Sequence, residues 1–239
     1  ETGVRPVAYE IAMSEMFVPY HDPDQHWFYR AYFDMGEYGF GNMASELKGH
    51  DCPSNATFQS VVLHTAAGEP FTAPNRICIF EFDPGYPSWR HYESLYAGVP
   101  GIETHHSRRA TNLVVRMAAT IGNYDYFQDY VFQQDGKVRI RLISTGVDAT
   151  KGVFAATLAD PTAESETQTG TLIAPYRLGV NHDHFFSYRI DMDVDGTNNN
   201  FERHRLVPVA QPENAPRQGI WGVQRERVAD ESSAQTVMQ

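Results

Sequence analysis

The chain has 239 residues, of which 41% are hydrophobic and 21% charged, so it is long enough to bury a sizeable core. Its 30 acidic and 19 basic residues give a net charge of −11. Such a chain has no basic patch with which to neutralise phosphate, which argues against nucleic acid or an anionic membrane surface as the main partner. No apolar run approaches the length of about 18 residues that a membrane-spanning helix requires.

The start of the chain points to a processed protein. The sequence begins with Glu1, Thr2 and Gly3 and has no initiating Met. We interpret residues 1–3 as a remnant of cloning, and we expect the protein to be secreted after removal of a signal. No internal repeat and no linker divides the remainder, so residues 4–239 are predicted to form one domain.

The two cysteines fit an oxidising compartment. The chain has two cysteines, Cys52 and Cys78, and an even number of cysteines in a secreted chain favours a disulfide. Two buried free thiols are the alternative. Asn55 begins the sequence Asn-Ala-Thr, an acceptor site for N-glycosylation. Both features favour a secreted glycoprotein.

Period-two patterns predict that the fold is mainly β. Apolar residues alternate with charged ones over 137–143 and over 187–195, as in half-buried strands. Residues 76–82 are apolar on both faces, as in a strand buried within a sandwich. The pair Asp135-Gly136 separates 130–134 from 137–143 and is typical of a two-residue hairpin. A large β-sandwich is the architecture that these patterns favour.

Three regions lack such patterns. Residues 84–101 and 148–170 are expected to be long loops. The segment after Leu206 contains several prolines and many polar residues, so we expect it to be irregular, with one short strand at Ile220-Trp221.

Two motifs in the last third of the chain could bind metals. His182 and His184 stand two residues apart at the head of a predicted strand, so both imidazoles can point to one face and reach one ion. Neutral imidazoles suit copper, zinc, iron or nickel. A polar strand edge is the alternative for this motif alone. The adjacent Asp191-Met192-Asp193 offers two carboxylates and a carbonyl, which are oxygen ligands suited to calcium.

Two further motifs could carry catalysis. Residues 123–126 read Asn-Tyr-Asp-Tyr, and a tyrosine beside a redox metal can be oxidised or used as a radical. Asp34 lies among the aromatic residues of 32–38, where desolvation would raise the pKa of its carboxyl group. A raised pKa suits a general base near neutral pH. Each motif by itself is also compatible with a purely structural role.

In this combination and order, the motifs resemble the catalytic domain of the copper amine oxidases. The resemblance extends from about Arg5 to about Ala234, and Asn-Tyr-Asp/Glu-Tyr is highly specific to that family. It implies the large β-sandwich of that catalytic domain, with copper and topaquinone as cofactors. The implied reaction converts primary amines, O₂ and water to aldehydes, ammonia and hydrogen peroxide.

The resemblance also assigns roles to individual residues. Tyr124 becomes the precursor of topaquinone, and its neighbours Asn123 and Asp125 become cofactor-binding residues. Asp34 becomes the catalytic base, and Tyr20 the tyrosine that hydrogen-bonds the oxygen of the cofactor. Cys52 and Cys78 match the family disulfide. The implied metal ligands are His182 and His184 for copper, and Asp191, Asp193 and the carbonyl of Met192 for a peripheral calcium ion.

One part of the family pattern is not found in this sequence. Family members place a third histidine ligand and the rest of the calcium site in a C-terminal segment beyond the position of Gln239. We therefore expect residues 4–239 to be the N-terminal portion of a catalytic domain, with uncertain activity by itself. The family is usually dimeric through this domain, which implies a homodimer for the full-length protein.

Two other classes of function stay open at this point. A catalytically incomplete relative could use the sandwich for binding or adhesion. A generic metal-binding sandwich such as a cupin would account for the His-x-His motif, although it gives no reason for the motif at 123–126.

Overall fold

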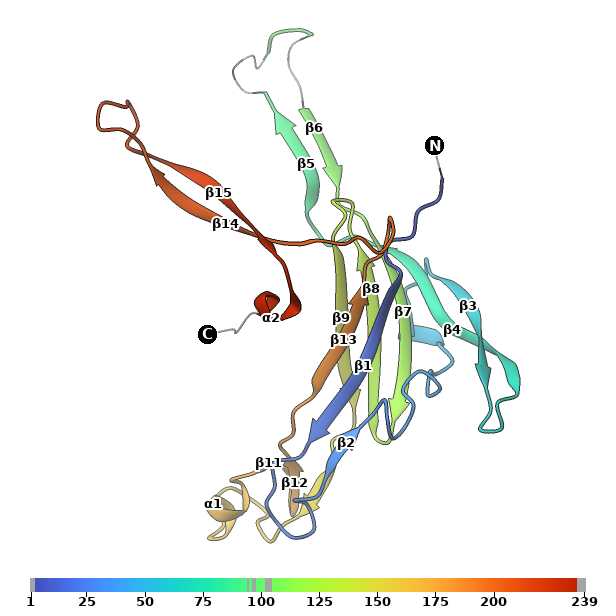
Figure 1. Cartoon of the computed structure of the whole chain (residues 1–239). Helices are drawn as coiled ribbons and strands as arrows, with labels where there is room; N and C mark the ends of the chain where they lie inside the picture. Colours follow the sequence, from blue (N-terminus) through green and yellow to red (C-terminus); the bar gives the residue numbers. More distant parts are fainter. Residues whose placement is uncertain (1–2, 94, 96–97, 102–104, 236–239) are drawn as a thin grey trace. The chain divides into compact units, whose positions relative to one another are not determined.

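The computed structural model describes residues 3–93, 95, 98–101 and 105–235 (Figure 1). Glu1 and Thr2 of the predicted cloning remnant, and residues 236–239 of the predicted domain, lie outside the described residues. The fold is mainly β, as predicted, with strands β1 to β15 and only short helices. Within the described ranges, no helix is long and apolar enough to cross a membrane.

The chain divides into two compact units, one formed by residues 13–187 and the other by residues 1–12 and 188–239. The first unit is built on a five-stranded antiparallel sheet with the order β3-β4-β7-β8-β9. Its strands are β3 (Thr57–His64), β4 (Pro70–Phe82), β7 (Asn112–Ile121), β8 (Tyr124–Phe132) and β9 (Val138–Gly146). The strands predicted at 76–82 and 137–143 thus lie within β4 and, apart from Lys137, within β9.

Tight turns set the register of this sheet. Gly122 and Asn123 form the two-residue loop between β7 and β8, and Gly122 adopts a φ of +58°, which glycine tolerates without steric cost. The predicted turn at Asp135-Gly136 joins β8 to β9, with the Gln133 amide donating to the Lys137 carbonyl at 2.9 Å. The first of these loops fixes where Tyr124 begins β8.

The core under this sheet contains the predicted disulfide. Cys52 and Cys78 are bonded to each other across 26 residues, so the alternative of free thiols is wrong. In the chain-entropy model, closing a loop of this size stabilises the fold by roughly 3–4 kcal/mol. The bridge is buried in an apolar cluster of Leu47, Cys52, Cys78, Phe80, Val114, Ala118 and Val131.

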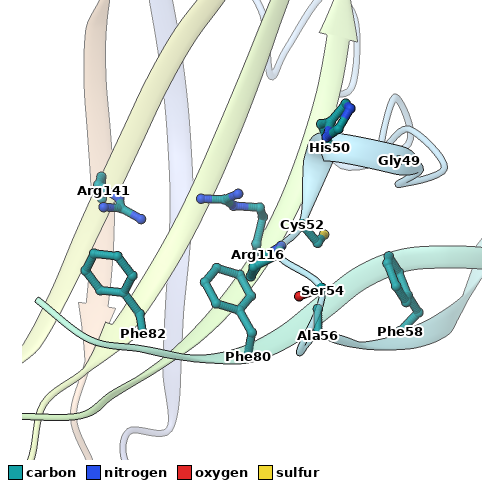
Figure 2. A pocket seen from close by; sticks show the side chains of 11 residues that line it. Gly49, His50, Cys52, Ser54, Ala56, Phe58, Phe80, Phe82, Arg116 and Arg141 are labelled. Atoms are coloured by element: carbon teal, nitrogen blue, oxygen red, sulfur yellow. The ribbon is translucent and has the colours of Figure 1, made fainter.

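A charged cluster stabilises the middle of the same sheet. The Asp129 carboxylate is fully buried, and it accepts hydrogen bonds from the guanidinium groups of Arg116 (2.7 and 3.0 Å) and Arg141 (3.0 and 2.5 Å). Figure 2 shows both arginines in a pocket of about 690 Å³, beside the rings of Phe80 and Phe82. Because the arginines are held by Asp129, we assign this pocket a structural role.

Asp129→Asn should destabilise the protein by about 3 kcal/mol, since it keeps the side-chain volume and leaves two arginines without their counterion. The measurement is the free energy of unfolding from urea titration. Asp135→Asn is the matched control, because Asp135 pairs with Lys137 on the surface and its loss should change little. Equal stabilities of the two variants would contradict the assigned role.

Smaller sheets accompany the central one and position the candidate site. One has the order β13-β1-β2 and another the order β10-β12-β11, while β5 and β6 form a ribbon. Their bounds are β1 (Glu10–Pro19), β2 (Ala31–Phe33), β5 (Pro87–Tyr92), β6 (His105–Arg109), β10 (Thr150–Gly152), β11 (Gly170–Ala174), β12 (Arg177–Val180) and β13 (Phe185–Asp191). The strand predicted at 187–195 therefore begins two residues earlier and ends at Asp191. A one-turn helix, α1 (Ala163–Glu166), lies between β10 and β11.

All three of the segments predicted to be irregular contain regular strands among their described residues, and the expected loop at 148–170 includes β10 and α1. The expected loop at 84–101 includes β5, and the tail after Leu206 forms most of a long ribbon. This ribbon pairs β14 (Phe201–Ala210) with β15 (Gly219–Val228) over ten residues each, and α2 (Glu231–Ala234) follows. The prediction was wrong because both faces of this ribbon are largely exposed, so no apolar alternation marks it.

Candidate active site

The predicted catalytic residues converge from four separate segments of the first unit. Tyr20 follows β1, Asp34 follows β2, Tyr124 opens β8, and His182 and His184 precede β13. Tyr20, Asp34, Asn123, Tyr124 and Tyr126 line a pocket of about 240 Å³. Residues more than 100 positions apart in the sequence thus meet in one small cavity.

The hydroxyl groups of Tyr20 and Tyr124 are hydrogen-bonded to each other at 2.5 Å. The backbone amide of Ala149 donates a second hydrogen bond to the Tyr124 oxygen at 3.1 Å. Burial, followed by the hydrogen bond to Tyr124, raises the pKa of Tyr20, so its hydroxyl stays protonated. The Tyr124 oxygen is therefore held at a defined place in the pocket.

The two imidazoles lie against this tyrosine pair. The ring centroids of His182 and His184 are 4.9 Å apart, and they lie 5.3 and 5.8 Å from the ring of Tyr124. Asp183 between them is exposed and pairs with His21 at 2.9 Å, which fits the alternation expected for consecutive residues of an extended segment. The prediction that both imidazoles share one side of the segment is confirmed.

The hydrogen bond of His182 leaves one ring nitrogen available to a metal. Its Nδ1 lies 2.9 Å from the carbonyl oxygen of Val180, which can only accept, so Nδ1 carries the proton and Nε2 keeps its lone pair. Burial, and then the neighbouring His182, lower the pKa of His184, which favours its neutral, metal-binding form. These donors fit a divalent ion such as copper, as part of its ligand set.

Asp34 has the electrostatics of a base. Its side chain is only 3% exposed. Burial, and then the charges of Glu15 and Glu37, raise the pKa of its carboxyl group to about 6, while a hydrogen bond from Tyr126 acts in the opposite direction. A carboxylate with this pKa can take up a proton close to neutral pH.

Asn123 and Asp125, on either side of Tyr124, each form a hydrogen bond with a neighbouring segment. Asn123 lies in the hairpin loop, and its carbonyl oxygen accepts from the Val147 amide at 2.9 Å. Asp125 accepts a hydrogen bond from the Thr120 hydroxyl at 2.6 Å across the β7–β8 pair. These contacts give both residues a part in holding the start of β8; their predicted roles toward the cofactor stay predictions.

The predicted calcium ligands belong to the other unit. Asp191 ends β13, and its carboxylate pairs with Arg189 at 3.2 Å. Asp193 accepts a hydrogen bond from Asn199, and Met192 lies between the two. In the described part of the chain, no group of three or more His, Cys, Asp or Glu side chains that could hold a metal occurs. The calcium site stays a prediction, and so does the copper site, for which the described residues bring two imidazoles together.

Sequence reasoning passed over one member of the site. The motif at 123–126 includes Tyr126, but the sequence predicts no separate role for it. In the structure its side chain is fully buried, its hydroxyl lies 3.2 Å from Nδ1 of His184, and it lowers the pKa of Asp34. The signal was present, because residues two apart on a strand share a face and Tyr126 stands two residues after Tyr124.

Comparisons with known proteins identify the family of the chain. The family model described as "Copper amine oxidase, enzyme domain" matches residues 2–239. The chain is 41% identical over 224 residues to primary amine oxidase 2 of Arabidopsis thaliana, covering 92% of this chain and 33% of that protein. It is 40% identical over 233 residues to the primary amine oxidase of Klebsiella aerogenes, covering 96% and 30%.

Solved structures of the same class share the fold. The copper-containing benzylamine oxidase of Hansenula polymorpha aligns with a TM-score of 0.74 at 27% identity, covering 94% of this chain and 33% of that one. An amine oxidase of Aspergillus nidulans aligns with a TM-score of 0.70 at 30% identity, covering 92% and 27%. The predicted β-sandwich of the copper amine oxidase catalytic-domain type is confirmed.

The chain belongs to the copper amine oxidase family, as a part of its enzyme domain. It spans about a third of the length of the curated relatives it matches. No comparison favours the alternative of a binding or adhesion module, and the family assignment replaces the generic metal-binding sandwich.

Proposed function

We propose that this protein is a copper- and topaquinone-dependent primary amine oxidase. It would convert a primary amine, O₂ and water to an aldehyde, ammonia and hydrogen peroxide. The observation that carries the proposal is the pocket in which Tyr124, hydrogen-bonded to Tyr20, lies beside two imidazoles and a buried carboxylate. A module for binding or adhesion has no physical need for that set of groups.

The cofactors fit the residues of the site. His182 and His184 would hold copper through ring nitrogens, and Tyr124 would be the ring that becomes topaquinone. The quinone supplies an electrophilic carbonyl for the amine and accepts two electrons from it. The protein contributes position and acid–base chemistry around it.

Each remaining residue of the pocket has a task that its geometry supports. Tyr20 shares a hydrogen bond with the oxygen on the Tyr124 ring and holds that ring in one orientation. Asp34 accepts the proton from the α-carbon of the substrate, for which its raised pKa near 6 is suited.

The proposal also includes secretion, glycosylation, calcium binding and dimerisation, which are argued from features outside the pocket. The Cys52–Cys78 disulfide favours a secreted protein, although one relative at 39% identity is named a peroxisomal amine oxidase. Asn55 is exposed and could accept a glycan, while its amide donates to the Glu81 carbonyl at 3.0 Å. We also propose calcium at Asp191, Met192 and Asp193, and a homodimer of the full-length enzyme.

Copper binding and quinone formation test the proposal. The 239-residue chain by itself should bind copper weakly and keep Tyr124 unmodified, because two ligands leave an ion open to water. Adding a segment with a third donor, in cis or co-expressed, should give tight copper, a visible quinone band and a coloured phenylhydrazine adduct.

Elemental analysis gives the copper stoichiometry, and peptide mass spectrometry reads the mass of the Tyr124 peptide beside it. Tight copper and a modified Tyr124 in the 239-residue chain alone would contradict the expected ligand count. Tight copper in the completed protein without any modification of Tyr124 would overturn the proposed function.

A further inference from the structure

The oxygen of Tyr124 is held by two groups that come from different segments of the chain. The hydroxyl of Tyr20 and the backbone amide of Ala149 both hydrogen-bond it, at 2.5 and 3.1 Å. Tyr20 follows β1, whereas Ala149 lies between β9 and β10. The position of this oxygen therefore depends on what fixes these two segments relative to each other.

A buried carboxylate joins the same two segments. Asp22, two residues after Tyr20, is only 3% exposed, and its Oδ2 accepts a hydrogen bond from Nζ of Lys151 at 2.9 Å. Lys151 in turn follows Ala149 by two residues. The ion pair of Asp22 and Lys151 thus links the two segments two residues away from the groups that hold the Tyr124 oxygen.

The other contacts of Asp22 fix its own loop and a third segment. Its Oδ1 accepts from the Asp24 amide at 2.9 Å, which closes a turn at the start of this loop. Its Oδ2 also accepts from the Thr169 hydroxyl at 3.0 Å, and the Thr169 carbonyl accepts from the Asn181 amide at 2.9 Å. A buried carboxylate that accepts hydrogen bonds from three groups has a fixed position.

We propose that Asp22 is a positioning residue that braces the two groups holding the Tyr124 oxygen against each other. Its carboxylate is bound by Lys151 and Thr169, so it acts through the segments that carry Tyr20 and Ala149. Loss of either charge leaves the other without its counterion, and the segments are then free to move apart. The consequence for the cofactor rests on the proposed function, whereas the effect on the hydrogen bonds of Tyr124 does not.

Hydrogen exchange of the Ala149 amide in the 239-residue chain tests the brace, because this amide donates to Tyr124. The internal reference is the amide of Leu47, a residue of the apolar cluster around the disulfide, which donates to the Asn75 carbonyl at 2.8 Å. A general loss of stability accelerates the exchange of both amides together, whereas loss of the brace accelerates that of Ala149 alone. The ratio of the two exchange rates is therefore the quantity to compare.

Two variants remove the brace from opposite ends. Asp22→Ala deletes the carboxylate, and Lys151→Met deletes the charge of its partner while keeping the length of the side chain. Each should raise the ratio by about tenfold, the equilibrium value of one hydrogen bond. Lys151→Met decides the question if Asp22→Ala does not fold, and a wild-type ratio in either folded variant would overturn the proposal. Tyr124→Phe removes the acceptor itself, so a wild-type ratio there would mean that the hydrogen bond is absent and would overturn the proposal as well.

The rate of quinone formation in the completed protein measures the consequence for the cofactor. After copper is added, the quinone band should appear about 10–100-fold more slowly in Lys151→Met than in the wild type, because the ring oxygen is displaced from its place in the site. Asp135→Asn, which breaks the surface pair with Lys137, is the matched control and should behave as the wild type. Equal rates in Lys151→Met and the wild type would contradict this consequence. If the exchange ratios behave as expected and the completed wild-type protein forms no quinone, the proposed function fails and the role of Asp22 stands.

Discussion

Replacing Tyr124 by phenylalanine should abolish the quinone and all turnover of amine while leaving the fold nearly unchanged. The phenol oxygen is the atom from which oxidation of this ring must start, and phenylalanine cannot supply it. The variant loses the hydrogen bonds with Tyr20 and Ala149, which together cost on the order of 1–2 kcal/mol. The effect on activity is thus complete, whereas the effect on stability is small.

The measurement is benzylamine oxidation in any preparation in which the wild-type sequence is active, with the mass of the peptide containing residue 124 read in parallel. Tyr130→Phe is the control, since Tyr130 lies on the same strand and bonds Gln128 at 2.6 Å rather than the site. Residual oxidation of benzylamine by the Tyr124→Phe protein would mean that the cofactor is built elsewhere.

Replacing Asp34 by asparagine should slow amine oxidation by ~10²–10⁴-fold, the usual loss when a general base is removed. Asparagine keeps the size of the side chain and its ability to accept a hydrogen bond from Tyr126, but it cannot take up the α-proton. Cofactor formation should persist. A substrate deuterated at the α-carbon checks the step, because slowed proton removal keeps a large isotope effect. Unchanged turnover would move the base to another residue.

The pH dependence of the wild type follows from the same carboxylate. Because burial raises the pKa of Asp34 to about 6, the active, ionised form is lost as the pH falls through that value. Activity should therefore decrease below about pH 6. Glu37→Gln removes one of the negative charges that raise this pKa, so the acidic limb of its profile should shift to lower pH.

The raised pKa of Asp34 affects the stability of the fold in the opposite direction to the activity. As the pH rises through about 6, activity increases and the contribution of Asp34 to stability is lost. A carboxyl group whose pKa is higher in the folded state favours folding only while it is protonated, and this contribution is lost as the pH rises through about 6. Above that pH, Asp34→Asn should be more stable than the wild type. A lower unfolding temperature of the variant at neutral pH would contradict the pKa assigned to Asp34.

Parts of three strands of the central sheet, β4, β8 and β9, could be predicted from local pattern alone, whereas β3 and β7 were not predicted. Alternation at 137–143 and the turn at Asp135-Gly136 led to the β8–β9 hairpin, because side chains of a half-buried strand face core and solvent in turn. The same reasoning failed for the ribbon of β14 and β15. Its residues are stabilised by pairing across the ribbon rather than by burial, and such pairing leaves little trace in composition.

The motifs of the site were also visible in the sequence, and their residue types indicated their chemistry. His182-x-His184 and Asn-Tyr-Asp-Tyr lie within short segments, so the two-residue period of an extended chain already placed their side chains on one face. Cys52 and Cys78 were recognised as a pair by their number alone. The class of chemistry could therefore be predicted from a few short segments of the sequence.

Only the tertiary structure decided how these stretches meet. It placed the hydroxyl groups of Tyr20 and Tyr124 2.5 Å apart, buried Asp34 near the charges of Glu15 and Glu37, and brought the Tyr126 hydroxyl to 3.2 Å from Nδ1 of His184. Contacts of this kind join segments separated by up to about 100 residues, and their distances depend on how the sheets pack. A pKa, a tautomer or the direction of a hydrogen bond depends on those distances, which local patterns do not encode.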